Sequence, residues 1–556
     1  MGKRSGRTKI ALWLGGCFAL GIAQGGSALG PRGTDSRELR DAVDMQIHLN
    51  PAQLFDQPAP RGLPSRIHPK LVRYYHERDM QPLWTAGDGP NPSAVILHEA
   101  LAAAESHGLN PSDYYIGQID RYWNAKDALS LARLELLLTL AITDFVSDMS
   151  GGRRRPREID PELFPTAREN DVDPVDLVQR CLACVDLKAF LEDQAPPFTQ
   201  YRELRAKLAE YRALAAAGGW PQVRTGPVLK PGQNDPRIPE VRKRLAATGD
   251  CPAAGAVDDK AYDETLVAAV KDFQRRNGLV TDGLIGRATQ AAMNVPAERR
   301  VRQIILNMES WRWVSRHPGD WYLVVNIPSF DLTAVNHDKV ELTMPVIVGE
   351  EYNMTPVFSD SVRYVIFNPY WDVPLSIAQK EMLPKLQKDS SYLKKERIRL
   401  YEGRVEDAHE VDATAVDWSQ VKPEDMTRYR LRQDTGPDNS LGTVGFIFPN
   451  AFNVYLHDTP AYTLFEQPKR TFSHGCIRVS RAQELAAYIL GGTDKSWTVD
   501  RVRATIAEGK NQVVHLEASL PIFILYNTAV IDLESHELLF YEDVYGRDAL
   551  LEKALF

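Results

Sequence analysis

The sequence of 556 residues has few cysteines and little that predicts a metal site. Its five cysteines are Cys17, Cys181, Cys184, Cys251 and Cys476. Cys181 and Cys184 form a C-x-x-C pair, but no second C-x-x-C or H-x₃-H follows at zinc spacing, so we predict no metal site. The pair is interpreted either as two half-buried thiols or as a local disulfide. Cys476 has no neighbour in sequence with which to pair.

The chain also lacks an excess of positive charge. It holds 66 Lys and Arg against 74 Asp and Glu, a net charge of −8, which gives no reason to expect nucleic acid as a partner. Apolar and charged fractions of 44% and 25% are typical of a soluble globular protein, and the length predicts three or four domains.

Several catalytic motifs are missing as well. The sequence contains no H-E-x-x-H, G-x-S-x-G or phosphate loop. Ser391 and Lys394 have S-x-x-K spacing without a K-T-G, so we discount them as a serine-type site. Of the twelve histidines, ten show no ligand spacing and are expected to be ordinary surface or core residues: His48, His68, His76, His98, His107, His317, His337, His409, His515 and His536.

The N-terminus predicts export. Four basic residues precede the apolar run at 10–23, and small residues surround a cut after Ala28. Residues 1–28 are therefore expected to be a signal peptide. The run is shorter than the roughly 20 residues of a membrane span, and an uncleaved anchor is the alternative.

The rest of the chain divides by pattern into a multidomain α+β protein. Residues 29–69, rich in Pro, Asp and Gln, are expected to form a flexible tether. We then expect a helical scaffold domain at 70–226, three short helices at 227–296, a β-rich domain at 297–545 and a C-terminal tail at 546–556. Residues 378–429 are polar and predicted to be a mostly helical insertion in the β-rich domain, placed to act as a lid.

The stretch "TFSHGCIRVS" predicts a nucleophile. A thiol that attacks a carbonyl must ionise, needs a base and needs donors that face the oxyanion. Ser480 and Gln483 predict a capping box for a helix that ends at Gly491 and Gly492. Cys476 lies four residues before that cap, where the helix dipole helps little, so activation must come chiefly from an imidazole.

Two histidines are candidates for the base. His474 is two residues before Cys476, and such residues lie about 6.5–7 Å apart along a strand. His457 in "NVYLHDTP" is at the end of another predicted strand and can approach the sulfur directly, so we predict that His457 is the base. His474 would then shape the pocket. Gly475 permits a tight turn in which its N–H and that of Cys476 face the oxyanion.

These residues carry a resemblance. Fifteen residues separate His457 from the run Ser473-His474-Gly475-Cys476-Ile477. This arrangement resembles the H-x₁₄₋₁₇-[ST]-H-G-C signature of L,D-transpeptidases with a YkuD-like domain. The broad family signature often ends in Asn, whereas Arg478 follows Ile477 here, as is common in many members. Stretches such as "NPYWDVPLSI" and "YLHDTPAYTLF" look like the large YcbB-type subgroup. "VKDFQRRNGLVTDGLIGRATQAAMN" resembles a peptidoglycan-binding-like helical domain.

The resemblance implies a two-step acyl transfer. Cys476 would attack the bond between the diamino acid and the terminal D-Ala of a tetrapeptide stem, with His457 as acid and base. An amine of a second stem would take the thioester, giving a 3→3 crosslink. The resemblance implies no cofactor, acylation by carbapenems and peptidoglycan stem peptides as partners. It places the protein in the periplasm of a Gram-negative bacterium, with inner-membrane association through the N-terminus as the anchored form.

Other pocket residues have two readings each. For Tyr455, Trp371 and Phe472, core packing and substrate contact are equally open. Arg478 could hold a substrate carboxylate or pair with Asp458. Two other functions also stay open: a carboxypeptidase or endopeptidase that uses water as acceptor, and a non-catalytic wall-binding protein.

Overall fold

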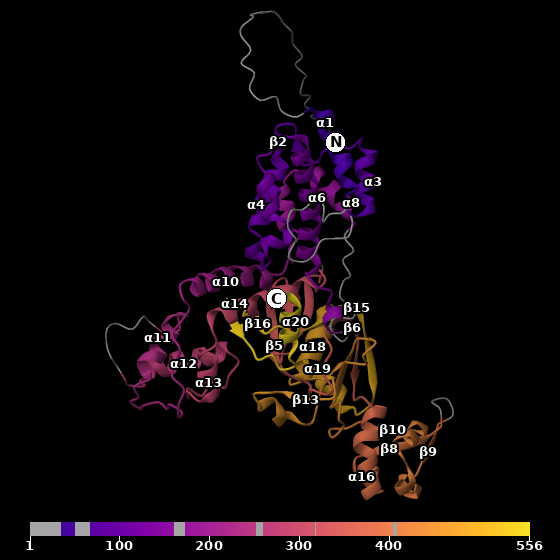
Figure 1. Cartoon of the computed structure of the whole chain (residues 1–556). Helices are drawn as coiled ribbons and strands as arrows, with labels where there is room; N and C mark the ends of the chain where they lie inside the picture. Colours follow the sequence, from indigo (N-terminus) through magenta and orange to yellow (C-terminus); the bar gives the residue numbers. More distant parts are fainter. Residues whose placement is uncertain (1–34, 50–66, 161–172, 252–259, 317, 404–407) are drawn as a thin grey trace, which may run out of the picture.

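The computed structural model describes residues 35–49, 67–160, 173–251, 260–316, 318–403 and 408–556. The predicted signal at 1–28 lies outside these residues, as does most of the tether. None of the helices in the described segments is long and apolar enough to cross a membrane. Figure 1 shows a helical region at the top, a β-rich centre, three helices to one side and the insertion at the lower right.

The helical region is built around α6 (Ala128–Gly151), which Asp127 caps by accepting a hydrogen bond from Ser130 N–H. Sixteen of the 24 residues of α6 are buried, as expected for a helix that is apolar on nearly all sides. The other helices of this region are α1 (Ser36–Ile47), α3 (Pro69–Glu77), α4 (Pro92–Ala102), α5 (Ile116–Tyr122), α7 (Pro156–Ile159), α8 (Pro174–Ala183), α9 (Leu187–Glu192) and α10 (Thr199–Ala216). Cys181 and Cys184 are both free thiols.

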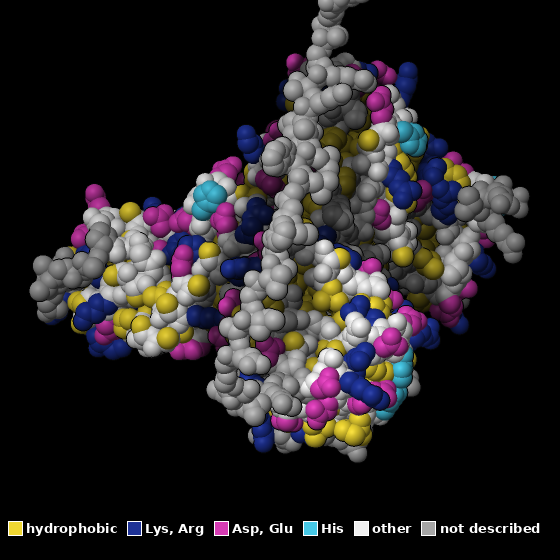
Figure 2. Space-filling model, turned by 90° about the horizontal axis from the view of Figure 1, so that it is seen from above, with side chains coloured by type: hydrophobic (Ala, Val, Ile, Leu, Met, Phe, Trp, Pro, Cys, Tyr) yellow, Lys and Arg dark blue, Asp and Glu magenta, His cyan; other side chains and the backbone are white. Residues whose placement is uncertain are grey.

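A three-helix unit follows, as predicted. It consists of α11 (Ile238–Ala246), α12 (Glu264–Arg276) and α13 (Arg287–Met293). Leu266, Val270 and Phe273 of α12 are buried in its core. Figure 2 shows that basic and acidic side chains are interspersed over the face that it presents, consistent with the balanced charge of the chain.

A buried polar network fastens the helical region to α14 (Ala297–Arg312), which leads into the β-rich domain. Arg312 and Glu309 form an ion pair of 2.7 Å with both side chains 1% exposed. Arg312 also donates to the carbonyl of His107 at 2.5 Å and to the hydroxyl of Tyr201 at 2.9 Å. Glu309 accepts from the N–H of Arg153. Groups from three segments of the helical region thus form hydrogen bonds with one buried charge pair, the kind of support that buried charges require.

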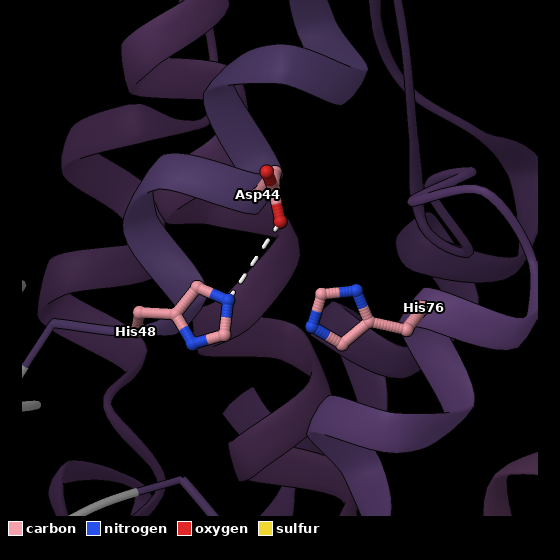
Figure 3. Close-up of side chains that lie close together, drawn as sticks. All are labelled: Asp44, His48 and His76. Atoms are coloured by element: carbon pink, nitrogen blue, oxygen red, sulfur yellow. Dashed lines mark ion pairs between the residues drawn. The ribbon is translucent and has the colours of Figure 1, made fainter.

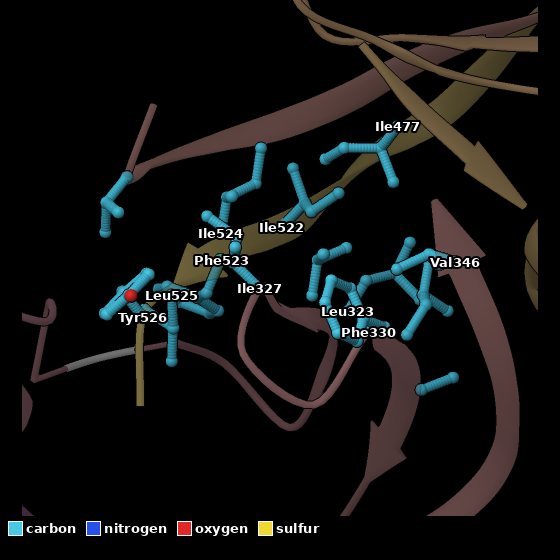
Figure 4. Packing of buried hydrophobic residues seen from close by; sticks show 14 of the residues in the cluster. Leu323, Ile327, Phe330, Val346, Ile477, Ile522, Phe523, Ile524, Leu525 and Tyr526 are labelled. Carbon is cyan, nitrogen blue, oxygen red and sulfur yellow. The ribbon is translucent and has the colours of Figure 1, made fainter. Parts of the chain in front are cut away.

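The β-rich domain is a nine-stranded mixed sheet in the order β13-β5-β14-β12-β11-β6-β15-β3-β4, and a further pairing of β4 with β5 closes it on itself. The strands are β3 (Trp321–Asn326), β4 (Asp331–Asn336), β5 (Lys339–Gly349), β6 (Phe358–Phe367), β11 (Val444–Ile447), β12 (Leu456–His457), β13 (Thr471–Ser473), β14 (Ile477–Val479) and β15 (Gln512–Leu525). Figure 4 shows Ile477, Ile522, Leu323 and Val346 within its interior. The expected fold class, helical N-terminal domains and a β-rich C-terminal domain, is confirmed.

The remaining C-terminal elements flank this sheet. They are α18 (Ala482–Thr493), α19 (Val499–Ala507), the β16 (Ala529–Ile531) and β17 (Leu538–Phe540) pair, and α20 (Arg547–Leu555). The predicted capping box of α18 is wrong, because Arg481 is the N-cap and the buried hydroxyl of Ser480 has no hydrogen-bond partner. The helix also continues through Gly491 and Gly492, which were expected to end it.

The insertion is mostly helical, as expected, and it also contains strands that the sequence pattern did not predict. It contains a four-stranded sheet in the order β7-β10-β8-β9. Its elements are β7 (Trp371–Asp372), α15 (Leu375–Ile377), a π-helical turn (Ala378–Met382), α16 (Leu383–Lys388), α17 (Tyr392–Lys395), β8 (Ile398–Glu402), β9 (His409–Val411), three 3-10 helices (Ala413–Ala415, Trp418–Gln420 and Pro423–Arg428) and β10 (Tyr429–Gln433). The strands are short and charged on their exposed positions, a pattern that resembles that of polar helices. Its own core includes Leu386, Leu393, Trp418 and Met426, so the insertion forms a small packed unit.

Candidate active site

The candidate site lies on one face of two neighbouring parallel strands. β12 pairs with β14 in the register Leu456 opposite Ile477 and His457 opposite Arg478. Leu456 and Ile477 are fully buried in the interior of the sheet. Because side chains alternate along a strand, Tyr455, His457, Cys476 and Arg478 project from the other face. The N–H of Ile477 donates to the carbonyl of Tyr455 at 3.1 Å, which fixes this register at the site.

A tight turn presents Cys476 at the start of β14. Gly475 has φ +107°, a region that favours glycine. The hydroxyl of Ser473 donates to the carbonyl of Cys476 at 2.5 Å and accepts from the N–H of Gly475 at 3.2 Å. Thr355 donates to the carbonyl of Gly475 at 2.9 Å. The turn is therefore held from within and from the segment after β5.

These hydrogen bonds determine which backbone N–H groups are available to donate to an oxyanion. The N–H of Gly475, expected to face the oxyanion, is engaged by Ser473. No hydrogen bond to the N–H of Cys476 occurs within the described part of the chain. The Cys476 amide is thus the available donor, and Ser473 holds the turn together.

His457 is a buried, neutral imidazole. Its ring is 4% exposed, and Nδ1 lies 2.5 Å from the carbonyl of Asp458. A carbonyl can only accept, so Nδ1 carries the proton and Nε2 is left as an acceptor. Burial first and the charge of Arg478 second lower the pKa of His457, the hydrogen bond to Asp458 opposes both, and together they bring the pKa to about 3. The imidazole is therefore able to take a proton at neutral pH.

Cys476 is half-buried, and its thiol is a neutral partner. Burial raises its pKa, whereas the N–H and hydroxyl of Tyr455 and the charge of Arg478 act to lower it. The sulfur lies 3.7 Å from the carbonyl of Asn453. No hydrogen bond joins the thiol to His457 in the described residues. The sequence predicted that an imidazole ionises the thiol, and the pKa shifts favour a neutral thiol and a neutral imidazole at rest.

Tyr455 contacts both members of this pair. Its ring centroid is 5.6 Å from that of His457, and its hydroxyl and N–H interact with Cys476. Core packing and substrate contact were the two open interpretations of Tyr455. The structure adds a third role, because Tyr455 stabilises negative charge on the sulfur.

Arg478 and Asp458 do not pair. The Asp458 carboxylate, which is buried, accepts from the N–H and hydroxyl of Thr443 at 2.9 and 2.7 Å and from the hydroxyl of Tyr462 at 2.6 Å. Arg478 makes no hydrogen bond or ion pair within the described residues, and its buried Nε has no partner. Burial lowers the pKa of Arg478, and the nearby Cys476 opposes this. An unpaired guanidinium beside the sulfur is suited to a carboxylate ligand.

His474 points away from the base position and reaches the insertion. Its Nε2 lies 2.5 Å from Glu381 Oε1, with both side chains about 40% exposed (38% and 42%). Glu381 belongs to the π-helical turn of the insertion. The catalytic turn is thus tied to the insertion by an ion pair that no spacing in the sequence predicts, because the two residues are more than ninety positions apart.

The last two predicted pocket residues are separate from this group. Trp371 is in β7 and packs against the core of the insertion. Phe472 is in β13 and is 41% exposed. Asp372, beside Trp371, acts electrostatically on Tyr455, so β7 lies near the site. Asn453 and Glu381 are contacts that sequence reasoning missed.

Comparisons with protein families agree with this architecture. Residues 320–503 match the L,D-transpeptidase catalytic domain (YkuD), residues 69–208 match the scaffold domain, and residues 234–293 match the family described as "Putative peptidoglycan binding domain".

Individual relatives cover parts of the chain. It is 31% identical over 232 residues to the "Putative L,D-transpeptidase" of Haemophilus influenzae, a match that covers 42% of this chain and 45% of the relative's length. A solved L,D-transpeptidase from Stackebrandtia nassauensis is 13% identical to this chain. The match covers 55% of this chain and 97% of the solved chain, with a TM-score of 0.21. The structure of LdtMt1 in complex with imipenem is 12% identical, and the match covers 37% of this chain and 59% of LdtMt1 with a TM-score of 0.17. TM-scores this low support no argument about this chain.

Proposed function

Because the chain carries an L,D-transpeptidase catalytic domain of the YkuD type beside scaffold and peptidoglycan-binding domains, we propose that it crosslinks peptidoglycan stem peptides through Cys476. The observation that carries the proposal is the shared face of β12 and β14, on which a thiol, a neutral imidazole, a tyrosine and an unpaired guanidinium converge. These groups supply a nucleophile, a base, a stabiliser of negative charge and a carboxylate anchor.

The first step is acylation of sulfur. Cys476 Sγ attacks the carbonyl carbon of the diamino acid in a tetrapeptide stem while its proton passes to Nε2 of His457. The resting pair is neutral, so proton transfer accompanies attack rather than preceding it. The N–H of Cys476 donates to the oxyanion. His457 then protonates the D-Ala amine, the C–N bond breaks, and a thioester with D-alanine as leaving group results.

Arg478 would orient the donor stem. The terminal D-Ala carries a free carboxylate a few bonds from the scissile carbonyl. A guanidinium without an internal partner can hold that carboxylate with charge-assisted hydrogen bonds.

The second step transfers the acyl group. A side-chain amine of another stem loses a proton to His457 and attacks the thioester, which restores the Cys476 thiol and forms a 3→3 crosslink. The helical unit at 234–293 would hold the wall polymer near the catalytic domain. Water in place of the amine would make the protein a carboxypeptidase on the same peptides.

The test is incubation of the protein with purified tetrapeptide muropeptides, followed by the intact mass of the protein and the masses of the products. We expect an acyl adduct on Cys476 and crosslinked dimers. Cys476→Ala should give neither, and Cys184→Ala, which changes another half-buried thiol, should give both. Shortened monomers without dimers would establish the hydrolase, and no adduct would exclude both enzymes.

Two further expectations rest on the same sulfur. A carbapenem should add its mass to the wild type and to Cys184→Ala and leave Cys476→Ala unchanged. Because the substrate is wall polymer, we propose that the protein acts outside the cytoplasm, either released or held at the inner membrane by its N-terminus. Fractionation of cells that express the full chain tests this placement.

A further inference from the structure

Three metal-binding side chains converge on the surface of the helical region, far from Cys476 in the chain. Asp44 and His48 lie one helical turn apart at the end of α1, and His76 is in the last turn of α3. Figure 3 shows the two imidazoles facing each other with the carboxylate beside them. One ligand atom from each residue lies within 4.8 Å of the other two.

The spacing of these atoms approaches that of a metal's ligands. Bonds of about 2.0–2.1 Å in tetrahedral geometry separate ligand atoms by about 3.4 Å. His48 Nε2 is 3.7 Å from Asp44 Oδ1, and the imidazole centroids are 5.4 Å apart. All three side chains are exposed, so a small rotation of each would close the site without moving the backbone.

The ion pair of Asp44 with His48 accounts for two members of the cluster but not for His76. The side chain of His76 makes no hydrogen bond or ion pair in the described part of the chain, and its contact is with the ring of His48. Both histidines are at helix C-termini: His48 caps α1, and His76 is one residue before the end of α3. The negative ends of two helix dipoles therefore favour a cation here.

We propose that Asp44, His48 and His76 bind one divalent transition-metal ion of the zinc class. Two imidazoles and one carboxylate suit zinc, with water completing the shell. The ion would join α1 to α3. Without it, α1 is held by packing of its buried face, which includes Leu39, Val43 and Ile47, against the helical core. The proposal departs from our prediction that these histidines are ordinary surface residues.

The test is a calorimetric titration of Zn²⁺ into metal-free full-length protein carrying Cys476→Ala, which removes a competing thiol. We expect one equivalent bound at this site and slower amide hydrogen exchange in α1 when Zn²⁺ is present. His76→Ala and His48→Gln should each weaken this binding by about 100-fold or more and abolish the protection of α1. Both residues are exposed, so both variants should fold.

A matched control is His337→Ala. His337 is an exposed histidine 3.6 Å from Asp320 that lacks a third ligand within the described residues, and its loss should leave zinc affinity unchanged. Zinc binding that is absent, that is equally tight in His76→Ala, or that leaves exchange in α1 unaltered would overturn the proposal. Hydrogen exchange localises the ion, so binding at the Cys181–Cys184 pair counts as a negative result for this site.

Discussion

The unpaired guanidinium of Arg478 permits a quantitative test of substrate anchoring. Replacing it in Arg478→Gln keeps much of the side chain and removes the charge. A hydrogen bond to a charged group contributes about 1.5–3 kcal/mol, and each 1.36 kcal/mol is a factor of ten in rate. We therefore expect kcat/KM for tetrapeptide to fall about 10- to 150-fold. The assay is release of D-alanine from a stem peptide.

A second substrate separates two roles of this residue. Arg478 also lowers the pKa of the Cys476 thiol, so a loss of activity could come from a weaker nucleophile. A stem peptide that ends in D-alaninamide has no terminal carboxylate. Anchoring predicts that the amide is a poor substrate for the wild type and that Arg478→Gln harms it little. Arg481→Gln, which removes a nearby exposed charge paired with Glu484, should affect neither peptide. Equal loss on the acid and the amide would refute carboxylate anchoring.

Four other predictions follow from the described contacts. Arg312→Met leaves Glu309 buried without its partner and should lower stability by about 3–5 kcal/mol, seen as a lower Tm. His457 is neutral in the fold down to a pH of about 3, whereas a free imidazole titrates near 6.5. The free energy of unfolding should therefore fall by about 1.4 kcal/mol per pH unit as the pH drops between these values. The Tm of His457→Gln should fall less between pH 6.5 and 4, and this variant should form no thioester. Glu381→Gln removes an exposed ion pair of about 0–1 kcal/mol and should raise KM by less than about fivefold, with the rate of thiol alkylation unchanged. Gly475→Ala puts a side chain at φ +107° and should reduce kcat/KM by about 100-fold through a displaced sulfur, measured with Tm as a control for folding.

Local patterns predicted much of the fold. The three helices at 238–293 have apolar spacing, stops and caps that depend on neighbours in sequence. The strands at Trp321–Asn326 and Lys339–Gly349 have the β-branched runs of a buried sheet. The capping box at Ser480 failed because the hydroxyl is turned into a buried position, where tertiary packing outweighs a local hydrogen bond. The strands of the insertion were missed because their exposed charges obscure the alternation.

The site was predictable where it follows from strand geometry. His457 and Cys476 were assigned from spacing, and strand pairing places them on one face. The ion pair of His474 with Glu381 and the convergence of His76 on Asp44 and His48 depend on contacts between separate elements. The spacing of Asp44 and His48 predicts that both lie on one face of a helix, but the third residue of the cluster, His76, comes from α3. The protonation of Cys476 also depends on burial, which no motif encodes.

The charge pair of Arg312 and Glu309 has a mechanical consequence. Tilting the helical region against the sheet would separate the buried guanidinium of Arg312 from the oxygens of His107 and Tyr201, and the carboxylate of Glu309 from the N–H of Arg153. The insertion, by contrast, meets the catalytic turn through an ion pair that water can screen. Thermal motion should therefore be concentrated in the insertion, while the helical region and the sheet move together as one rigid body.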